Sequence, residues 1–184
     1  MTSKSKKVVL GVVVCLIALI GILGATGPKH THAESSIVIN HPIGQVFAYI
    51  QMLKNGEQWS PWAKMDPNMK MDYHGQDGAA GNSVSWDGNF SVGSGTQTMT
   101  AIDPNKRIDY RLDFTRPMKG TATAYFTTEK TPDNQTKVTW GMDSENVTFM
   151  SRFMARAMNC QNMMEKVFAE GLGNMKAILE KPAQ

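Results

Sequence analysis

The chain has 184 residues, a length that accommodates one folded domain and an appendage. It carries 19 Lys and Arg residues against 16 Asp and Glu, and three of the basic residues precede the first apolar segment. The rest of the chain is therefore formally neutral, and its scattered charges do not form the clustered basic face that nucleic-acid binding needs. We predict no nucleic-acid partner.

An uncharged apolar segment occupies residues 8–25 and follows Lys4, Lys6 and Lys7. Its 18 residues would span roughly 27 Å as a helix, close to the roughly 30 Å hydrocarbon core of a bilayer. We expect residues 1–7 to form a cytoplasmic stub and residues 8–25 a single-pass transmembrane anchor, because basic residues favour the cytoplasmic side. The alternative is a signal sequence whose cleavage would release a secreted protein.

The segment after the anchor, residues 26–34, is polar and predicts a tether. It would join the membrane to a folded extracytoplasmic domain over residues 35–182. His30 and His32 lie on this segment, where we expect solvated spacer residues and no metal site.

The folded region opens with a strand and two short helices. Ser35–Asn40 is β-branched and is followed by turn residues, which predicts the first strand. Pro42 then begins a helical stripe that continues to Leu53, since proline suits a first helical turn. The stretch Trp59-Ser60-Pro61-Trp62 predicts a second short helix or turn.

Six further segments have the alternation or the β-branched composition of strands, and turn residues separate them. They are Met69–Tyr73, Ser83–Trp86, Gly93–Ile102, Arg107–Phe114, Thr121–Thr128 and Thr136–Met142. With the first strand they make a sheet of about six or seven strands. The short loops between them predict antiparallel pairing.

Apolar residues recur every three or four positions from Phe149 to Leu179, with polar residues between them. This spacing aligns one apolar face, so we predict one continuous helix, roughly 45 Å long, that the sheet wraps. Gly171 and Gly173 lie inside this predicted helix, although glycine has a low helix propensity. They suggest close approach to a strand, or a bend that borders a cavity.

Several short stretches, each weak alone, occur in an order and spacing typical of one superfamily. They are Ser36–Pro42, Val46-Phe47, Trp59–Trp62, Gly81–Trp86, Thr136–Trp140 and Glu170–Lys176. Across residues 35–181 the chain resembles the SRPBCC superfamily of START and pollen-allergen-like proteins, and in particular its bacterial polyketide cyclase/dehydrase-like branch. The resemblance implies an α+β helix-grip fold, a curved antiparallel sheet around a long C-terminal helix with two short helices after the first strand.

The resemblance also implies an apolar cavity between sheet and helix, which superfamily members use for lipids, hormones, polyketides or other hydrophobic molecules. Aromatic residues and methionines are the expected ligand-binding wall or rim, because pockets are mostly apolar and aromatic. They are Trp59, Trp62, Trp86, Tyr110, Phe114, Trp140, Phe153, Met164 and Phe168. The alternative for each tryptophan is core packing, and for the methionines a soft core.

The sequence carries no motif for catalysis or for a cofactor. The polar candidates are His41, His74, Asp87, Asp143 and Glu145, and none lies in a pattern that supplies a buried acid or base with a partner. Gly-x-Ser-x-Gly, HExxH and Cys-x-x-Cys do not occur. We therefore predict no catalytic residue, no metal site and no cofactor.

These observations predict a membrane-anchored, extracytoplasmic domain that binds a hydrophobic small molecule or lipid in the cavity. The first alternative is a cyclase or dehydratase-type enzyme that acts on a hydrophobic substrate in the same cavity. The second is a structural or partner-binding domain whose core is filled. A buried acid or base would favour the enzyme, and a cavity too small for a ligand would favour the filled core.

Overall fold

The structure is a computed structural model that describes residues 3–181, with side chains described from residue 7. The chain divides into two compact units. The first unit combines the described residues up to Thr31 with Glu145–Met163. The second combines His32–Ser144 with the described residues from Met164 onward.

The first unit is helical. Helix α1 (Ser3–Thr26) contains the apolar segment, and among the described residues Lys7–Thr26 is the one stretch long and apolar enough to cross a membrane. Helix α5 (Phe149–Ala157) packs against the last turns of α1. A capping box fixes the start of α5, because the Thr148 hydroxyl accepts a hydrogen bond from the Ser151 N–H and the Ser151 hydroxyl accepts one from the Thr148 N–H.

The second unit contains a seven-stranded sheet in the order β1-β7-β6-β5-β4-β3-β2, in which strands β2 to β7 pair antiparallel. The strands are β1 (His30–Ile39), β2 (Lys70–His74), β3 (Ser83–Asp87), β4 (Ser94–Asp103), β5 (Arg107–Arg116), β6 (Gly120–Lys130) and β7 (Thr136–Glu145). The predicted antiparallel sheet is confirmed. Strands β2 to β7 begin and end within three residues of their predicted bounds.

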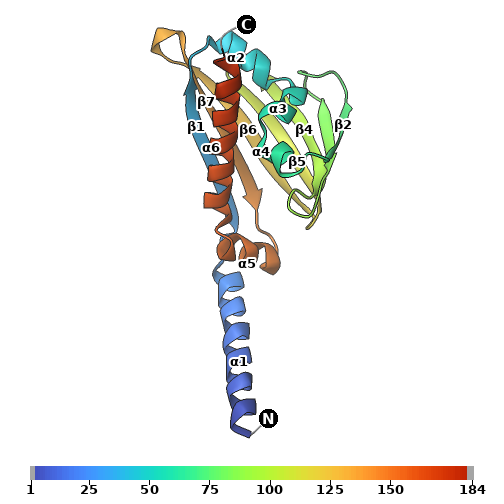
Figure 1. The fold of residues 1–184 in the computed structure, drawn as a ribbon, viewed down its shortest axis with the longest axis vertical. Helices are drawn as coiled ribbons and strands as arrows, with labels where there is room; N and C mark the ends of the chain where they lie inside the picture. Colours follow the sequence, from blue (N-terminus) through green and yellow to red (C-terminus); the bar gives the residue numbers. More distant parts are fainter. Residues whose placement is uncertain (1–2, 182–184) are drawn as a thin grey trace. The chain divides into compact units, whose positions relative to one another are not determined.

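Helices cover one face of the sheet (Figure 1). The short ones are α2 (Ile43–Ile50), the 3-10 turn η1 (Leu53–Asn55), α3 (Gly56–Trp59) and α4 (Pro61–Met65), and a second 3-10 turn, η2 (Pro132–Asn134), links β6 to β7. Helix α6 (Cys160–Leu179) lies over the same face of the sheet and buries Phe168, Leu172 and Met175. The α+β helix-grip fold is thereby confirmed.

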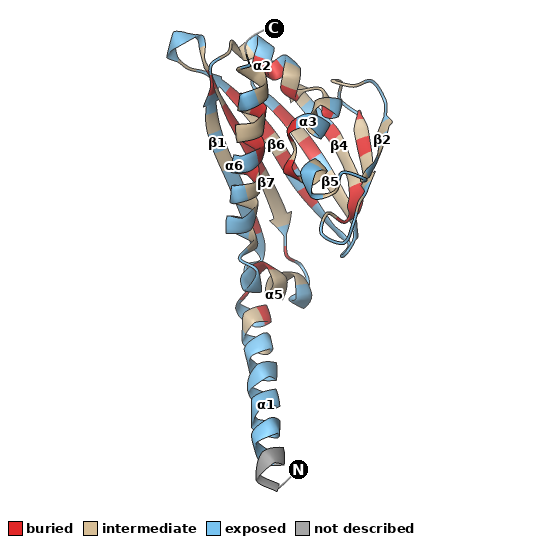
Figure 2. Cartoon of the chain, in the orientation of Figure 1, coloured by how far each residue is buried: buried red, intermediate tan, exposed pale blue. Residues whose placement is uncertain are grey.

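The covered face of the sheet carries the hydrophobic core. Side chains alternate in exposure along β5 and β6, and Figure 2 shows buried residues recurring along the strands of the sheet. The fully buried residues include Val46, Met99, Ile108, Val138, Leu172 and Met175. Two register shifts between β4 and β5 interrupt the regular ladder, and such irregularities bend strands and increase their twist.

The long helix predicted from Phe149 to Leu179 is two helices. Helix α5 ends at Ala157 and α6 begins at Cys160. Between them, Asn159 has a φ of 48°, a left-handed conformation that ends a helix and that asparagine adopts more readily than most residues. The apolar spacing continues across this break, which is why periodicity alone predicted one helix.

The segment predicted as a tether, residues 26–34, is largely strand. β1 begins at His30, and buried and exposed side chains alternate along it. His32 Nδ1 lies 2.8 Å from Asp143 Oδ1, and His30 Nδ1 lies 3.1 Å from Glu145 Oε1. Both histidines are exposed, as expected of solvated residues, but they belong to a strand and have carboxylate neighbours, where we expected a spacer.

Candidate functional site

A partly enclosed cavity of about 250 Å³ lies in the second unit, between the sheet and the helices that cover it. Its wall is almost wholly apolar. The sheet contributes Met71, Val84, Leu112, Ala124, Phe126 and Met142, among others. The short helices contribute Ile50, Leu53 and Ala63, together with two tryptophans. Walls of this composition suit a hydrophobic ligand, and the volume lies just below the roughly 300–1,000 Å³ of drug-sized pockets.

An aromatic cluster centred on Trp140 forms the deep part of the wall. The Trp140 ring lies 4.4 Å from Phe168 on α6 and stacks on Phe126 at 5.1 Å, measured between ring centroids. Trp59 and Trp62 meet the Trp140 ring edge-on, at 5.1 and 5.5 Å. Aromatic pairs in these geometries favour a fixed arrangement beyond simple area burial, so this part of the wall is preformed.

Helix α6 approaches the sheet closely because it has a glycine opposite Trp140. A Cβ at Gly171 would lie 2.8 Å from Cζ3 of Trp140 and 3.1 Å from Cδ of Pro61. A Cβ at Gly173 would meet nothing within 4 Å. The close approach to a strand suggested by the sequence therefore applies to Gly171 alone.

The side chain of Asn174 joins α6 to the two short helices that carry Trp59 and Trp62. Its Nδ2 donates to the backbone carbonyl of Trp59 at 3.0 Å, and its Oδ1 accepts from Nζ of Lys64 at 2.9 Å. Both tryptophans line the cavity. Asn174 therefore helps to hold this aromatic wall in place.

A second aromatic pair lines the cavity on the β3–β5 side of the sheet. Trp86 and Phe114 meet edge to face at 5.7 Å. Gly95 of the intervening strand β4 leaves room for this contact, since a Cβ there would lie 2.6 Å from Cη2 of Trp86.

Two uncharged polar side chains line the cavity from adjacent strands. Gln97 of β4 is paired with Leu112 of β5 and Met99 with Tyr110, so Gln97 and Tyr110 are diagonal neighbours on the covered face. Within the described residues neither side chain has a hydrogen-bond partner. Burial raises the pKa of Tyr110 well above its usual value, so the hydroxyl remains a neutral donor.

Glu57 is the one carboxylate among the lining residues that the structure describes. It is exposed, and its Oε1 accepts a hydrogen bond from the Tyr73 hydroxyl at 2.7 Å. Burial, followed by this bond and the nearby charges of Glu57 and Asp77, raises the pKa of Tyr73 far above its usual value. Glu57 is thus a solvated acceptor at the rim.

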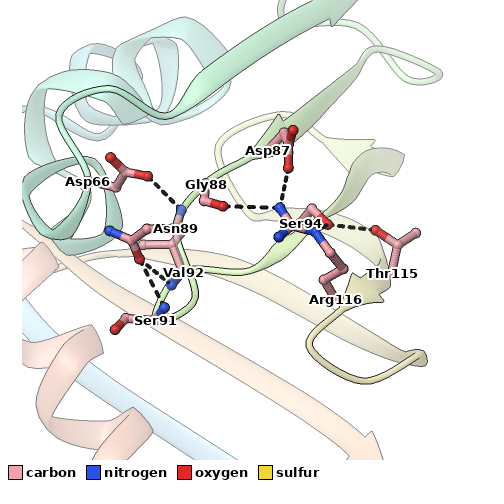
Figure 3. A network of polar contacts seen from close by, with 9 residues as sticks. All are labelled: Asp66, Asp87, Gly88, Asn89, Ser91, Val92, Ser94, Thr115 and Arg116. Carbon is pink, nitrogen blue, oxygen red and sulfur yellow. Dashed lines mark hydrogen bonds and ion pairs between the residues drawn. The ribbon is translucent and has the colours of Figure 1, made fainter.

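A polar network braces the loop between β3 and β4, which places Val92 in the cavity wall (Figure 3). Arg116 reaches this loop from the end of β5. Its Nη2 contacts the Asp87 carboxylate and donates to the carbonyl of Gly88 at 3.1 Å, while its Nε donates to Ser94 Oγ at 3.0 Å. The guanidinium therefore ties both ends of the loop to β5.

Asn89 organises the inside of the same loop (Figure 3). Its Oδ1 accepts hydrogen bonds from the backbone N–H groups of Ser91 and Val92, at 2.9 and 3.2 Å. Its own N–H donates to Oδ2 of Asp66 at 2.7 Å, which joins the loop to the end of α4.

The five polar residues considered for catalysis lie outside the cavity lining. Each has a polar neighbour: His41 has Gln45, His74 has Asp72, Asp87 has Arg116, Asp143 has His32 and Glu145 has His30. None therefore provides an unpaired, desolvated acid or base at the cavity. In the part of the chain that is described, no group of three or more His, Cys, Asp or Glu residues is arranged to hold a metal ion.

Eight of the nine residues predicted for the cavity wall or rim are placed along it. They are Trp59, Trp62, Trp86, Tyr110, Phe114, Trp140, Met164 and Phe168. Phe153 is not among the lining residues, because it belongs to α5 in the first unit and the helix breaks before α6 begins. Contact of a ligand with the other eight stays a prediction.

Sequence reasoning missed Glu57 and Gln97. Gln97 lies in a polar, threonine-rich strand where composition does not indicate which side chains face inward. Gln97 lies two residues before buried Met99, and residues two apart in a strand face the same side of the sheet. This spacing is the signal that could have identified Gln97 as a lining residue. Glu57 lies on a four-residue helix, too short to show a periodic pattern.

Residues 30–180 match the protein family described as "Polyketide cyclase / dehydrase and lipid transport". A comparison with curated protein sequences found no match. Solved structures share the fold at low sequence identity, which establishes similarity of the fold alone.

Three of these structures show the extent of the similarity. A protein from Mesorhizobium loti has a TM-score of 0.61 and 14% identity, over 83% of this chain and 99% of that chain. A protein from Chromobacterium violaceum has a TM-score of 0.57 and 13% identity, over 83% and 99% of the two chains. Ara h 8.0201 has a TM-score of 0.52 and 11% identity, over 80% and 99%.

Proposed function

The chain belongs to the polyketide cyclase / dehydrase and lipid transport family, and on that premise we propose that it binds a hydrophobic small molecule or lipid in its cavity. The observation that carries the proposal is a cavity of about 250 Å³ lined almost wholly by apolar and aromatic side chains. Family membership indicates hydrophobic ligands in general. The cavity supports binding inside this particular chain, and its volume argues against a filled core.

We further propose that α1 anchors this binding domain to a membrane, with the N-terminus cytoplasmic and the cavity outside. The length and apolar character of Lys7–Thr26 support an anchor, and the basic residues before it support the orientation. An anchored cavity would stay close to the bilayer, where an apolar ligand partitions. Cleavage of the same segment as a signal sequence, with release of the protein, is the alternative.

The ligand we propose is mainly apolar and carries one hydrogen-bonding group. Gln97 and Tyr110 support this, because the buried Tyr110 hydroxyl and the half-buried Gln97 amide have no partner among the described residues and gain a hydrogen bond when such a group enters. The apolar remainder would lie against the Trp140 cluster. A highly charged ligand does not fit, since the described lining residues include no Lys, Arg or His and one carboxylate, Glu57, which is exposed.

The cyclase or dehydratase alternative needs an acid or base beside the substrate. Tyr110 stays protonated and Glu57 is exposed at the rim, so the described lining residues give this chemistry little support. Conversion of a bound substrate that depended on Glu57 would favour the enzyme over the binding protein.

Intrinsic fluorescence tests the binding proposal directly, because all four tryptophans of the chain line the cavity. The full-length protein in nanodiscs would be titrated with an apolar fluorescent probe that accepts energy from tryptophan. We expect saturable energy transfer for the native chain and binding weakened about tenfold or more, about 1.4 kcal/mol, when Ala124→Phe fills the cavity.

Thr123→Phe is the matched control, since Thr123 is the exposed neighbour of Ala124 on the opposite face of β6. Val84→Phe provides a second cavity-filling variant if Ala124→Phe does not fold. Equal probe binding by the native, control and cavity-filled proteins would overturn the proposal.

A further inference from the structure

Helix α5 and the residue pair that precedes it expose a group of large apolar side chains. Val147 is 77% exposed, Phe149 49% and Met150 52%. Met158, directly after the helix, is 50% exposed. Exposed apolar side chains grouped in this way mark a protein or membrane interaction site.

The charges of α5 are all positive. Its sequence FMSRFMARA contains Arg152 and Arg156 and no acidic residue. Arg156 is exposed, whereas Nε of Arg152 donates to the carbonyl of Asn146 at 3.2 Å and thereby ties the helix to the chain before it. A short helix that combines exposed apolar residues with arginines has the composition of helices that lie in a membrane interface.

The contact between α5 and α1 fixes the level of these side chains along the spanning helix. A Cβ at Gly24 would overlap the ring of Phe149, and a Cβ at Gly27 would overlap the backbone carbonyl of Arg152. Thr26 is the last residue of α1, and a helix rises about 1.5 Å per residue. Gly24 therefore lies roughly 3 Å before the end of this helix. Phe149 therefore lies level with the boundary of the apolar segment.

We propose that α5 is an interfacial helix that docks on the outer surface of the bilayer. Val147, Phe149 and Met150 enter the edge of the hydrocarbon, and Arg156 contacts lipid phosphates. The partner is thus a phosphate-bearing lipid surface, favoured by the continuity of the apolar residues with α1 and by the charge of α5. This inference rests on the proposed anchoring by α1.

Spin labels read by electron paramagnetic resonance test the docking in the full-length protein. The chain would carry Cys15→Ala and Cys160→Ser and would be placed in vesicles of phosphatidylcholine with phosphatidylglycerol. Single labels would then be introduced by Val14→Cys in the anchor, Met150→Cys on α5, and Lys130→Cys as an exposed site on β6. Collisions with oxygen report a lipid position, and collisions with a water-soluble nickel chelate report an aqueous one.

We expect the labels at positions 14 and 150 to favour oxygen and the label at position 130 to favour nickel. A nickel-accessible label at 150 beside an oxygen-accessible label at 14 would overturn the docking of α5 and leave the anchor intact. A nickel-accessible label at 14 would overturn the anchor and the docking together.

The same label at position 150 tests the contact with lipid phosphates. Arg156→Gln is expected to shift it towards the nickel-accessible side, and replacement of phosphatidylglycerol by phosphatidylcholine is expected to do the same. Arg111→Gln, on the solvent-facing side of the sheet, is the matched control. An unchanged label depth with Arg156→Gln would overturn the role of Arg156.

Discussion

Gly171 of α6 faces Trp140 of β7 so closely that a Cβ at position 171 would lie 2.8 Å from Cζ3 of the indole. Trp140 in turn contacts Phe126, Phe168, Trp59 and Trp62. A helix glycine thus sets the distance between α6 and the aromatic wall of the cavity.

Gly171→Ala should therefore destabilise the protein, although alanine favours helix. The added methyl group must displace the Trp140 ring or Pro61, and overpacking of this kind costs about 1–3 kcal/mol. Gly173→Ala is the matched control and should stabilise by up to about 1 kcal/mol, because nothing lies within 4 Å of its added methyl group. Urea unfolding of both variants measures the difference, and an equal gain in both would contradict the close approach.

Tyr110→Phe should weaken the binding of a ligand that carries a hydrogen-bonding group by about fivefold. The change removes only the buried hydroxyl, and a hydrogen bond contributes about 0.5–1.5 kcal/mol. A purely apolar probe should bind both proteins equally. Tyr125→Phe is the control, since the Tyr125 hydroxyl bonds to Glu34 away from the cavity. Competition against the fluorescent probe gives both affinities, and an unchanged affinity for every polar ligand tested would contradict a role for Tyr110.

Alkaline pH should destabilise the fold through its tyrosines. Burial, aided by the hydrogen bond to Glu34, raises the pKa of Tyr125 from 10.0 to about 12, and Tyr49, Tyr73 and Tyr110 are shifted in the same direction. The unfolded chain loses these protons near pH 10 while the folded chain keeps them, so the contribution to stability is complete below pH 10 and is lost as pH rises towards 12.

Absorbance at 295 nm, which reports tyrosinate, checks this shift. At pH 10 the folded protein should show little tyrosinate, and the chain unfolded in guanidinium about half ionisation. Tyr125→Phe should reduce the loss of stability between pH 10 and 12. Half-ionised tyrosines in the folded protein at pH 10 would be inconsistent with the burial described.

Asn89→Ala should loosen the loop that carries Val92 with little effect on global stability. The change removes the acceptor of the Ser91 and Val92 N–H groups, and both lie in an exposed loop. Hydrogen exchange at these two amides should accelerate while exchange in the core strands stays the same. Phe90→Ala is the neighbouring control, because Phe90 is 84% exposed. Unchanged exchange at both amides would show that Asn89 does not order the loop.

Local patterns were sufficient to predict strands β2 to β7 and the apolar character of the cavity, but not the first half of β1. Alternation in β5, with Ile108, Tyr110, Leu112 and Phe114 on one side, correctly indicated the face that the helices cover. Turn residues marked the strand ends. These features depend on neighbours in sequence, which is why the sequence alone was enough.

Features set by long-range pairing or by one backbone angle were not predictable in this way. The apolar spacing runs through Asn159, so nothing in the periodicity shows that its backbone turns left-handed and ends α5. Gln97 and Tyr110 become neighbours only through the register of β4 on β5. The limits of the anchor and of the binding domain, residues 8–25 and 35–182, stay predictions.

Extraction of the bound molecule tests the central claim most directly. The full-length chain, Ala124→Phe and Thr123→Phe would be purified from their native membranes and analysed by mass spectrometry after solvent extraction. We predict one apolar species at about one molecule per chain in the native protein and in Thr123→Phe, and its loss from Ala124→Phe. A native protein that repeatedly carries no such species, or a species retained equally by Ala124→Phe, would contradict ligand binding in this cavity.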